Sequence, residues 1–117
     1  MTTITELYYA APARYPELSG KVAIITGSSR GIGAGIAARL AKEGMRVVIT
    51  GLDAAETEPA TADLRQAGAQ VSAVPGDLSN DTLVDALFEH TLTTYGQLDL
   101  LVNNAADLRR FRARDVD

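Results

Sequence analysis

Residues 26–33, TGSSRGIG, decide the fold, because they join a strand pattern to a helix pattern. The preceding residues 22–25, VAII, form a short apolar run rich in β-branched side chains, which is typical of a buried strand. After the turn, Ile32, Ile36 and Leu40 recur at intervals of four, which predicts a helix with one apolar face. The glycines therefore lie in a strand-to-helix turn.

Each glycine of this turn has a physical use. Because glycine lacks a Cβ atom, the backbone can turn sharply and a ligand can approach closely. The free N–H groups at a helix start carry a partial positive charge of roughly +0.5, which suits a phosphate. The spacing of Gly27, Gly31 and Gly33 predicts a pyrophosphate cradle with the helix beginning near Gly31, rather than ordinary loop glycines. No Gly-Lys-Ser/Thr follows, which excludes the usual P-loop.

The composition indicates one small domain. The chain has 117 residues, of which 46% are hydrophobic, enough for a core. It has no cysteine, which excludes a disulfide scaffold and favours a reducing compartment. No apolar run approaches the ~20 residues of a membrane span, and no Lys or Arg precedes Arg14 to begin a signal peptide. We expect a cytoplasmic protein without membrane contact.

The charges are unevenly distributed around a net charge of −4. Residues 53–99 carry nine acidic side chains and one basic one, so this region would repel a nucleic-acid backbone. The basic cluster near the C-terminus consists of Arg109, Arg110, Arg112 and Arg114. It is short and has one interleaved aromatic residue, Phe111, so we predict no nucleic-acid binding.

The N-terminal residues 1–19 have no steady hydrophobic period. Pro12 and Pro16 are expected to break any helix there, which predicts a loose arm. The arm contains Tyr8, Tyr9 and Tyr15. These rings either pack onto a neighbouring surface or belong to a solvated arm.

Beyond the arm, strand and helix patterns alternate. Strand patterns lie at residues 22–26, 45–50, 70–74 and 98–102. Helix patterns lie at residues 31–43, at residues 56–67 with Pro59 in the first turn, and from Ser79 or Asn80 to about residue 94. This order predicts an α/β fold with a parallel doubly wound sheet, strand order 3-2-1-4 and right-handed crossovers. A ligand crevice is then expected outside the carboxyl ends of the first and fourth strands.

From about Leu18 to Ala106 the sequence resembles the short-chain dehydrogenase/reductases. The resemblance rests on residues 20–33, GKVAIITGSSRGIG, on Asp77-Leu78, and on residues 98–105, LDLLVNNA. It implies a Rossmann fold and an NAD(P)-dependent oxidoreductase, usually a dimer or tetramer. Ala106 departs from the family pattern, which has glycine there.

The resemblance also assigns roles to individual residues. Cofactor contacts are implied for Gly27, Ser29, Arg30, Gly31, Ile32, Gly33, Gly51, Asp77, Leu78, Asn104, Ala105 and Ala106. Asp77 would accept a hydrogen bond from the adenine amino group, the alternative being that it only caps the turn after Pro75-Gly76. Asn103 would brace the backbone near Gly27, and Thr26 would stabilise the turn. No metal is implied.

Cofactor choice depends on the end of the second strand. Gly51 stands where NAD-preferring relatives carry an acid, and Arg30 matches a basic position of NADP-preferring relatives. A guanidinium suits the 2′-phosphate of NADP. Against this, Leu52 replaces a second Arg of many NADP enzymes, and Asp53 lies close by. We predict that NADP(H) is favoured over NAD(H).

The family's catalytic Ser and Tyr-x-x-x-Lys are missing. The two lysines are Lys21 and Lys42, and the residues four positions before them are Glu17 and Ala38. His90 stands alone on an acidic helix and is interpreted as a surface residue rather than a base. We therefore expect a partial, truncated cofactor-binding domain at residues 20–106, an end loop at 107–117, and no activity of this chain alone.

Two other classes remain as alternatives, a non-catalytic nucleotide-binding regulator and a phospho-receiver-like signalling domain. The receiver needs five strands and acids at the end of the first strand, where this chain has Thr26-Gly27. For the partial domain, the fourth strand would be an uncovered apolar edge, so self-association is also expected.

Overall fold

Four parallel strands form the sheet, in the order β3-β2-β1-β4. The computed structural model describes residues 2–104. The strands are β1 (Val22–Ile25), β2 (Arg46–Ile49), β3 (Val71–Ala73) and β4 (Leu100–Val102). In register, Ile24 of β1 pairs with Val48 of β2 and with Leu101 of β4. The predicted fold class and strand order are confirmed.

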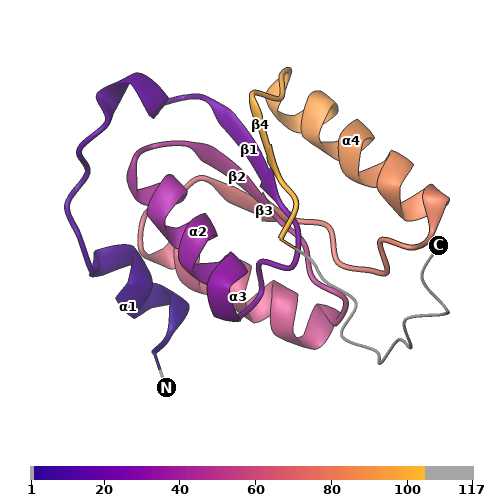
Figure 1. The fold of residues 1–117 in the computed structure, drawn as a ribbon, viewed down its shortest axis with the longest axis horizontal. Coiled ribbons are helices and arrows are strands. Elements are labelled where there is room, and N and C mark those ends of the chain that lie inside the picture. The colour runs from indigo at the N-terminus through magenta and orange to yellow at the C-terminus, as the bar shows by residue number, and fades with distance from the viewer. Residues whose placement is uncertain (1, 105–117) are drawn as a thin grey trace, which may run out of the picture.

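Helices cover both faces of this sheet (Figure 1). They are α1 (Ile4–Tyr9), α2 (Gly31–Lys42), α3 (Ala54–Gln66) and α4 (Asp81–Tyr95), with a short 3₁₀ turn η1 at Pro16–Leu18. The first three lie on one side of the sheet and α4 lies on the other (Figure 1). None of the helices within residues 2–104 is long and apolar enough to cross a membrane.

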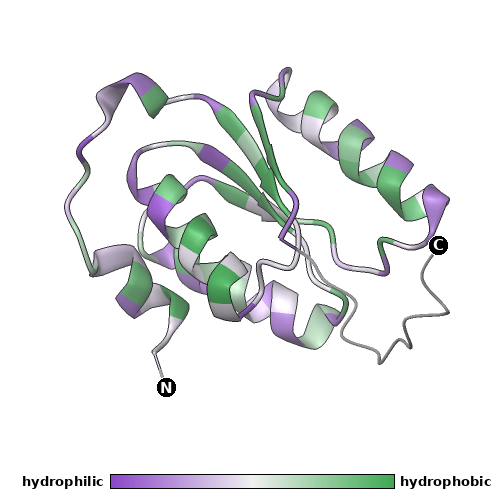
Figure 2. Cartoon of the chain, viewed as in Figure 1, coloured by the Kyte–Doolittle hydropathy of each residue, from purple (hydrophilic) through white to green (hydrophobic). Residues whose placement is uncertain are grey.

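The alternation of side chains along the strands creates two cores. Ala23 and Ile25 of β1 point to the side of α1, α2 and α3, whereas Ile24 packs with Leu87 of α4. Figure 2 shows largely apolar strands, and in α4 apolar residues are interspersed with polar ones. Helix α2 approaches the sheet closely, since small residues, Ala34, Ala37, Ala38 and Ala41, form its buried face.

Helix α3 begins earlier than predicted. Asp53 caps it by accepting a hydrogen bond from the Ala55 N–H at 2.8 Å, so the helix starts at Ala54. Pro59 therefore lies in the second turn and not in the first, which corrects the prediction. As proline has no N–H, it cannot donate to the carbonyl of residue 55.

The N-terminal segment is not a loose arm, because it contains helix α1. Thr3 and Glu6 form a capping box, in which the Thr3 hydroxyl accepts from the Glu6 N–H at 3.1 Å. Ile4 is buried in the core, and the Tyr9 hydroxyl donates to the Ala67 carbonyl at 3.3 Å. The two prolines follow α1, so they limit its length and do not prevent it.

Glu43, just after α2, anchors the rest of this segment. Its buried carboxylate accepts hydrogen bonds from the N–H groups of Arg14 (2.8 Å) and Tyr15 (2.6 Å), and it pairs with Arg39. Burial opposes ionisation and raises the pKa of Glu43. The two backbone donors and the Arg39 guanidinium outweigh burial, so this pKa lies below its ordinary value of 4.5.

Strand β4 is the least covered strand. Leu100 and Leu101 are 39% and 41% exposed. Because neighbouring residues of a strand point to opposite faces, both faces of β4 are partly uncovered. Asp99 fixes the start of β4, as its carboxylate accepts from the Val22 N–H at 2.8 Å and from the Gln97 amide at 2.7 Å. These donors hold the pKa of Asp99 below its ordinary value of 3.8.

Candidate functional site

The turn between β1 and α2 has the backbone that the glycine spacing predicts. Gly27 and Gly31 both have φ of +63°, a region that disfavours residues with a side chain. Gly33 has another role, because a Cβ atom there would lie 2.0 Å from the Gly27 carbonyl oxygen. Only glycine therefore lets α2 pack this closely on the turn.

Two hydrogen-bonding residues tie the turn to the end of β4. The Thr26 N–H donates to the Val102 carbonyl at 3.0 Å, and the Thr26 hydroxyl accepts from the Asn104 N–H at 2.9 Å. The Asn104 side-chain amide donates to the Gly27 carbonyl at 3.2 Å. The brace near Gly27 is thus Asn104 and not Asn103, which corrects the prediction. Asn103 is exposed and faces a neighbouring hollow.

Ser28 ties the same turn to β2, a role that sequence analysis missed. Its buried hydroxyl donates to the Ile25 carbonyl at 2.7 Å and accepts from the Thr50 N–H at 3.0 Å. The Ser28 N–H also donates to the Thr50 carbonyl at 2.8 Å. The sequence signal that could have indicated this role is a small hydroxyl residue between Gly27 and Gly31.

At Gly51 a side chain would crowd two neighbouring hydroxyl groups. A Cβ atom on Gly51 would lie 2.6 Å from the Ser29 hydroxyl oxygen and 2.7 Å from that of Thr57. The Gly51 carbonyl accepts from the Gly76 N–H at 2.9 Å, which brings the end of β3 beside the end of β2. An acid at position 51 would therefore require rearrangement of its neighbours.

Two charged side chains flank this edge. Arg30, the N-cap residue of α2, reaches across to Glu56 in the first turn of α3, with 3.4 Å between Nη1 and Oε1. The Arg30 side chain is 81% exposed and that of Glu56 is 42% exposed. The pair is therefore a solvated surface contact, which water screens strongly.

The loop after β3 places Asp77 and Leu78 at the same edge. One carboxylate oxygen of Asp77 accepts from the Ser79 N–H at 2.9 Å, so Asp77 stabilises its own turn. Leu78 is half-buried and lines a hollow of about 180 Å³ between α4 and the ends of β1 and β4. The other lining residues are Thr26, Val84, Leu87, Phe88, Leu101 and Asn103.

The start of α2 is open to solvent. Ile32 is 78% exposed, and no acidic residue lies in the first turn of this helix. An anion near Gly31 would therefore meet the helix N–H groups without a competing carboxylate on α2. The predicted contacts Ala105 and Ala106 lie outside the described residues.

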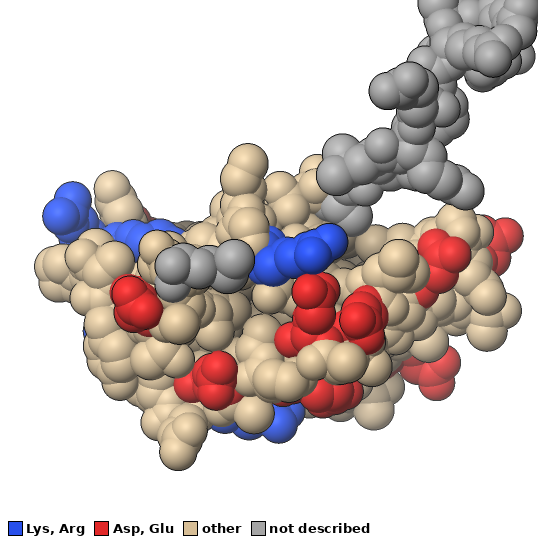
Figure 3. Space-filling view, turned by 90° about the horizontal axis from the view of Figure 1, so that it is seen from below, with Lys and Arg blue, Asp and Glu red and all other residues tan. Residues whose placement is uncertain are grey.

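Acidic side chains are spread over the face shown in Figure 3. Despite this, within residues 2–104 no group of three His, Asp or Glu side chains is placed to hold a metal ion.

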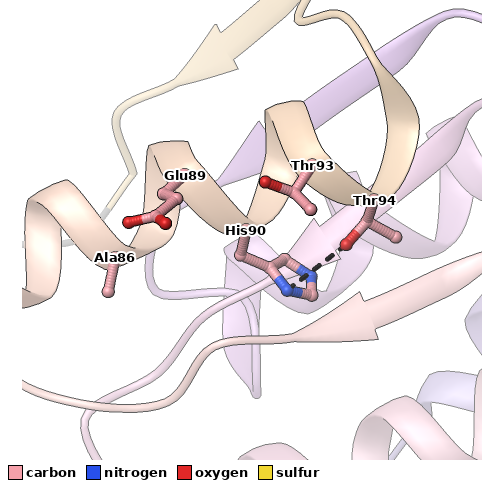
Figure 4. A pocket seen from close by; sticks show the side chains of 5 residues that line it. All are labelled: Ala86, Glu89, His90, Thr93 and Thr94. Atoms are coloured by element: carbon pink, nitrogen blue, oxygen red, sulfur yellow. Dashed lines mark hydrogen bonds between the residues drawn. The ribbon is translucent and has the colours of Figure 1, made fainter.

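A second polar cluster lies between α4 and β3. His90 Nε2 is 2.8 Å from the Ser72 hydroxyl oxygen, which also accepts from the Tyr95 hydroxyl at 2.8 Å. His90 also borders a shallow hollow with Thr94 on α4 (Figure 4). His90 is therefore half-buried and bonded, which corrects its interpretation as a plain surface residue. Because Ser72 does not line the hollow, we assign the cluster to packing.

Similarity to known proteins identifies the family of this chain. The family model for short chain dehydrogenases matches residues 21–117, which is most of the chain. The chain belongs to the short-chain dehydrogenase family. Its parallel sheet is the NAD(P)-binding fold of that family, and the phospho-receiver interpretation is not favoured.

Three similar proteins illustrate the range of the family. A 3β-hydroxysteroid dehydrogenase from Eggerthella lenta is 40% identical over 92 residues, covering 78% of this chain and 35% of that protein. The L-sorbose reductase of Gluconobacter frateurii, solved with NADPH and L-sorbose, is 37% identical with a TM-score of 0.76. The match covers 85% of this chain and 38% of that one.

A family member from Burkholderia phymatum, solved with NAD, is 39% identical with a TM-score of 0.70. The match covers 73% of this chain and 30% of that one. This chain thus spans about a third of the length of the relatives that it matches, and these relatives include both NADPH and NAD complexes.

Proposed function

We propose that this chain is the NAD(P)(H)-binding part of an oxidoreductase that transfers a hydride between a nicotinamide cofactor and an alcohol or carbonyl substrate. The contact of Gly33 with the Gly27 carbonyl supports this most strongly. It brings the open start of α2 against the carboxyl ends of β1 and β4, where a doubly wound sheet binds its ligand.

In this proposal the cofactor lies along the carboxyl edge of the sheet. Its pyrophosphate accepts hydrogen bonds from the backbone at the start of α2, near Ser29, Gly31 and Ile32. The adenine lies toward Asp77 and Leu78, and one Asp77 oxygen keeps its turn bond to Ser79. We propose cofactor contacts for Asn104, Ala105 and Ala106 as well, and Asn104 also braces the Gly27 carbonyl.

We further propose that NADP(H) is favoured over NAD(H). The Arg30 guanidinium is exposed near the end of β2, and Gly51 offers no carboxylate to a ribose 2′-hydroxyl. A guanidinium binds a phosphate through two hydrogen bonds, a strong and directional contact.

The hydride-transfer chemistry needs groups that this chain does not supply. Its two lysines, Lys21 and Lys42, follow Glu17 and Ala38 at a distance of four, so no Tyr-x-x-x-Lys pair is present in the sequence. In the family that tyrosine is the general acid or base. We propose that the 117-residue chain binds cofactor and has no dehydrogenase activity alone.

Titration of the full chain with NADPH and NADH tests these statements. The chain has no tryptophan, so the nicotinamide fluorescence of either cofactor can be followed directly. We expect Arg30→Ala to weaken NADPH binding by about tenfold or more and to leave NADH binding nearly unchanged. Lys21→Ala, a cation at the opposite end of β1, is the matched control. Equal weakening for both nucleotides would contradict the NADP(H) preference.

We also propose that the chain associates with itself through β4. Within residues 2–104 this strand pairs on one side only, and Leu100 and Leu101 expose apolar surface on both of its faces. Light scattering across a concentration series should show species larger than a monomer, and Leu101→Lys should reduce them. A monomer at high concentration would contradict the proposal.

A further inference from the structure

The Arg30–Glu56 pair spans the gap between the glycine turn and the link from β2 to α3. Its two ends come from the N-cap of α2 and the first turn of α3, and the charged atoms are 3.4 Å apart. Both side chains are solvated, so each can exchange its partner at little cost.

This gap is the place where the two nucleotides would differ. In dinucleotide-binding sheets, the residues at the end of the second strand face the adenosine ribose. Here Gly51 presents no side chain, and the hydroxyl groups of Ser29 and Thr57 lie close to where one would begin. The ribose 2′ position would then face side chains from the neighbouring elements, and Arg30 and Glu56 form a charged pair between the start of α2 and the start of α3.

Glu56 has opposite effects on the two cofactors. Its carboxylate attracts the Arg30 guanidinium away from the cofactor, and it also repels a 2′-phosphate directly. Both effects weaken the binding of NADP(H). A carboxylate can accept a hydrogen bond from a 2′-hydroxyl, which is the group that NAD(H) carries. The nearby Asp53 is less available, because it caps α3 through the Ala55 N–H at 2.8 Å.

We propose that Glu56 is a specificity-determining residue that competes with the 2′-phosphate of NADP(H) for Arg30 and so limits the preference for that cofactor. The inference rests on the proposed function. Because an exposed ion pair is weak, Glu56 tunes the preference and does not reverse it.

The variant Glu56→Gln tests the proposal, with Glu58→Gln as control. Glu58 lies two residues further along α3 and thus about 200° around the helix, on a different face. We expect Glu56→Gln to tighten NADPH binding by about two- to fivefold, and to leave NADH binding unchanged or slightly weaker. The gain should shrink at high salt. Glu58→Gln should move neither affinity by a comparable amount.

A double variant separates competition for Arg30 from a general change of charge. If Glu56 acts through Arg30, then Glu56→Gln should give a smaller NADPH gain when Arg30→Ala is also present. An equal gain for NADPH and NADH, or no gain, would overturn the role of Glu56 and leave the proposed function intact. No binding of either nucleotide to any variant would overturn both.

Discussion

The two strands that flank the candidate site differ sharply in burial. All four residues of β1 are fully buried, whereas Leu100 and Leu101 of β4 are 39% and 41% exposed. Yet both strands contribute to the same turn, β1 through Thr26 and β4 through the residues just beyond Val102. The glycine turn is therefore supported by a fully buried strand on one side and by a partly covered strand on the other.

The largest expected effect is on the side of the fully buried strand. Gly33→Ala would place a Cβ atom 2.0 Å from the Gly27 carbonyl oxygen, and the resulting overpacking should cost about 3 kcal/mol or more of unfolding free energy. Urea unfolding measures it. Gly35→Ala is a close control in the same helix, since a Cβ atom there meets nothing within 4 Å. This substitution should raise the free energy of unfolding by as much as about 1 kcal/mol, because alanine favours the helix more than glycine does. If the two substitutions changed the free energy of unfolding equally, the close packing of Gly33 on the Gly27 carbonyl would be shown to yield easily.

Truncating one apolar side chain in each strand compares β1 with β4 directly. Ile24→Ala removes a fully buried side chain and should cost about 2–5 kcal/mol. Leu101, its partner in register, is partly exposed, so Leu101→Ala should cost about 1 kcal/mol or less in urea unfolding at low concentration. A cost for Leu101→Ala as large as that for Ile24→Ala would mean that β4 is covered in solution.

The pH dependence tests the anchor behind α2. The pKa of Glu43 is lowered in the folded chain, so its stabilisation is complete above the ordinary value of 4.5 and is lost as the pH falls through the folded pKa. Glu43→Gln should lower stability at neutral pH and flatten the loss in acid, as measured by thermal unfolding. Glu17→Gln, an exposed acid in η1, is the control. If the Glu43→Gln variant lost as much stability at low pH as the original chain, the pH dependence of stability would belong to other groups.

The smallest expected change in unfolding free energy concerns the face of the sheet that α4 covers. Tyr95→Phe removes the hydrogen bond to the Ser72 hydroxyl and should cost about 1 kcal/mol. Tyr9→Phe removes a longer bond at an exposed ring and should cost less. Chemical unfolding of both variants gives the comparison, and a larger loss from Tyr9→Phe would reverse the ranking of the two contacts.

The elements with strong local signals were predictable from the sequence. The spacing of Gly27, Gly31 and Gly33 reflects needs of the backbone itself, so the turn could be placed without any tertiary contact. The strand order followed from the alternation of strand and helix patterns and from the dinucleotide-binding form of the doubly wound sheet. Both are cases in which local pattern and global fold agree.

Other features depend on contacts that a pattern does not contain. Helix α1 has only six residues, too few for a hydrophobic period, and its one signal was the capping box of Thr3 and Glu6. Whether Asn103 or Asn104 reaches Gly27 depends on the direction of the chain as it leaves β4. The Arg30–Glu56 pair joins residues 26 positions apart, and sequence alone does not place them together.

The bonds from Thr26 and Gly27 to Asn104 have a consequence for the order in which the molecule is made. They join positions 78 and 77 residues apart, so they close the largest loops described around the turn. Closing such long loops is slow because chain entropy opposes it. During synthesis from the N-terminus, β1 and α2 emerge well before Asn104, and the turn acquires its last brace only when that residue has left the ribosome.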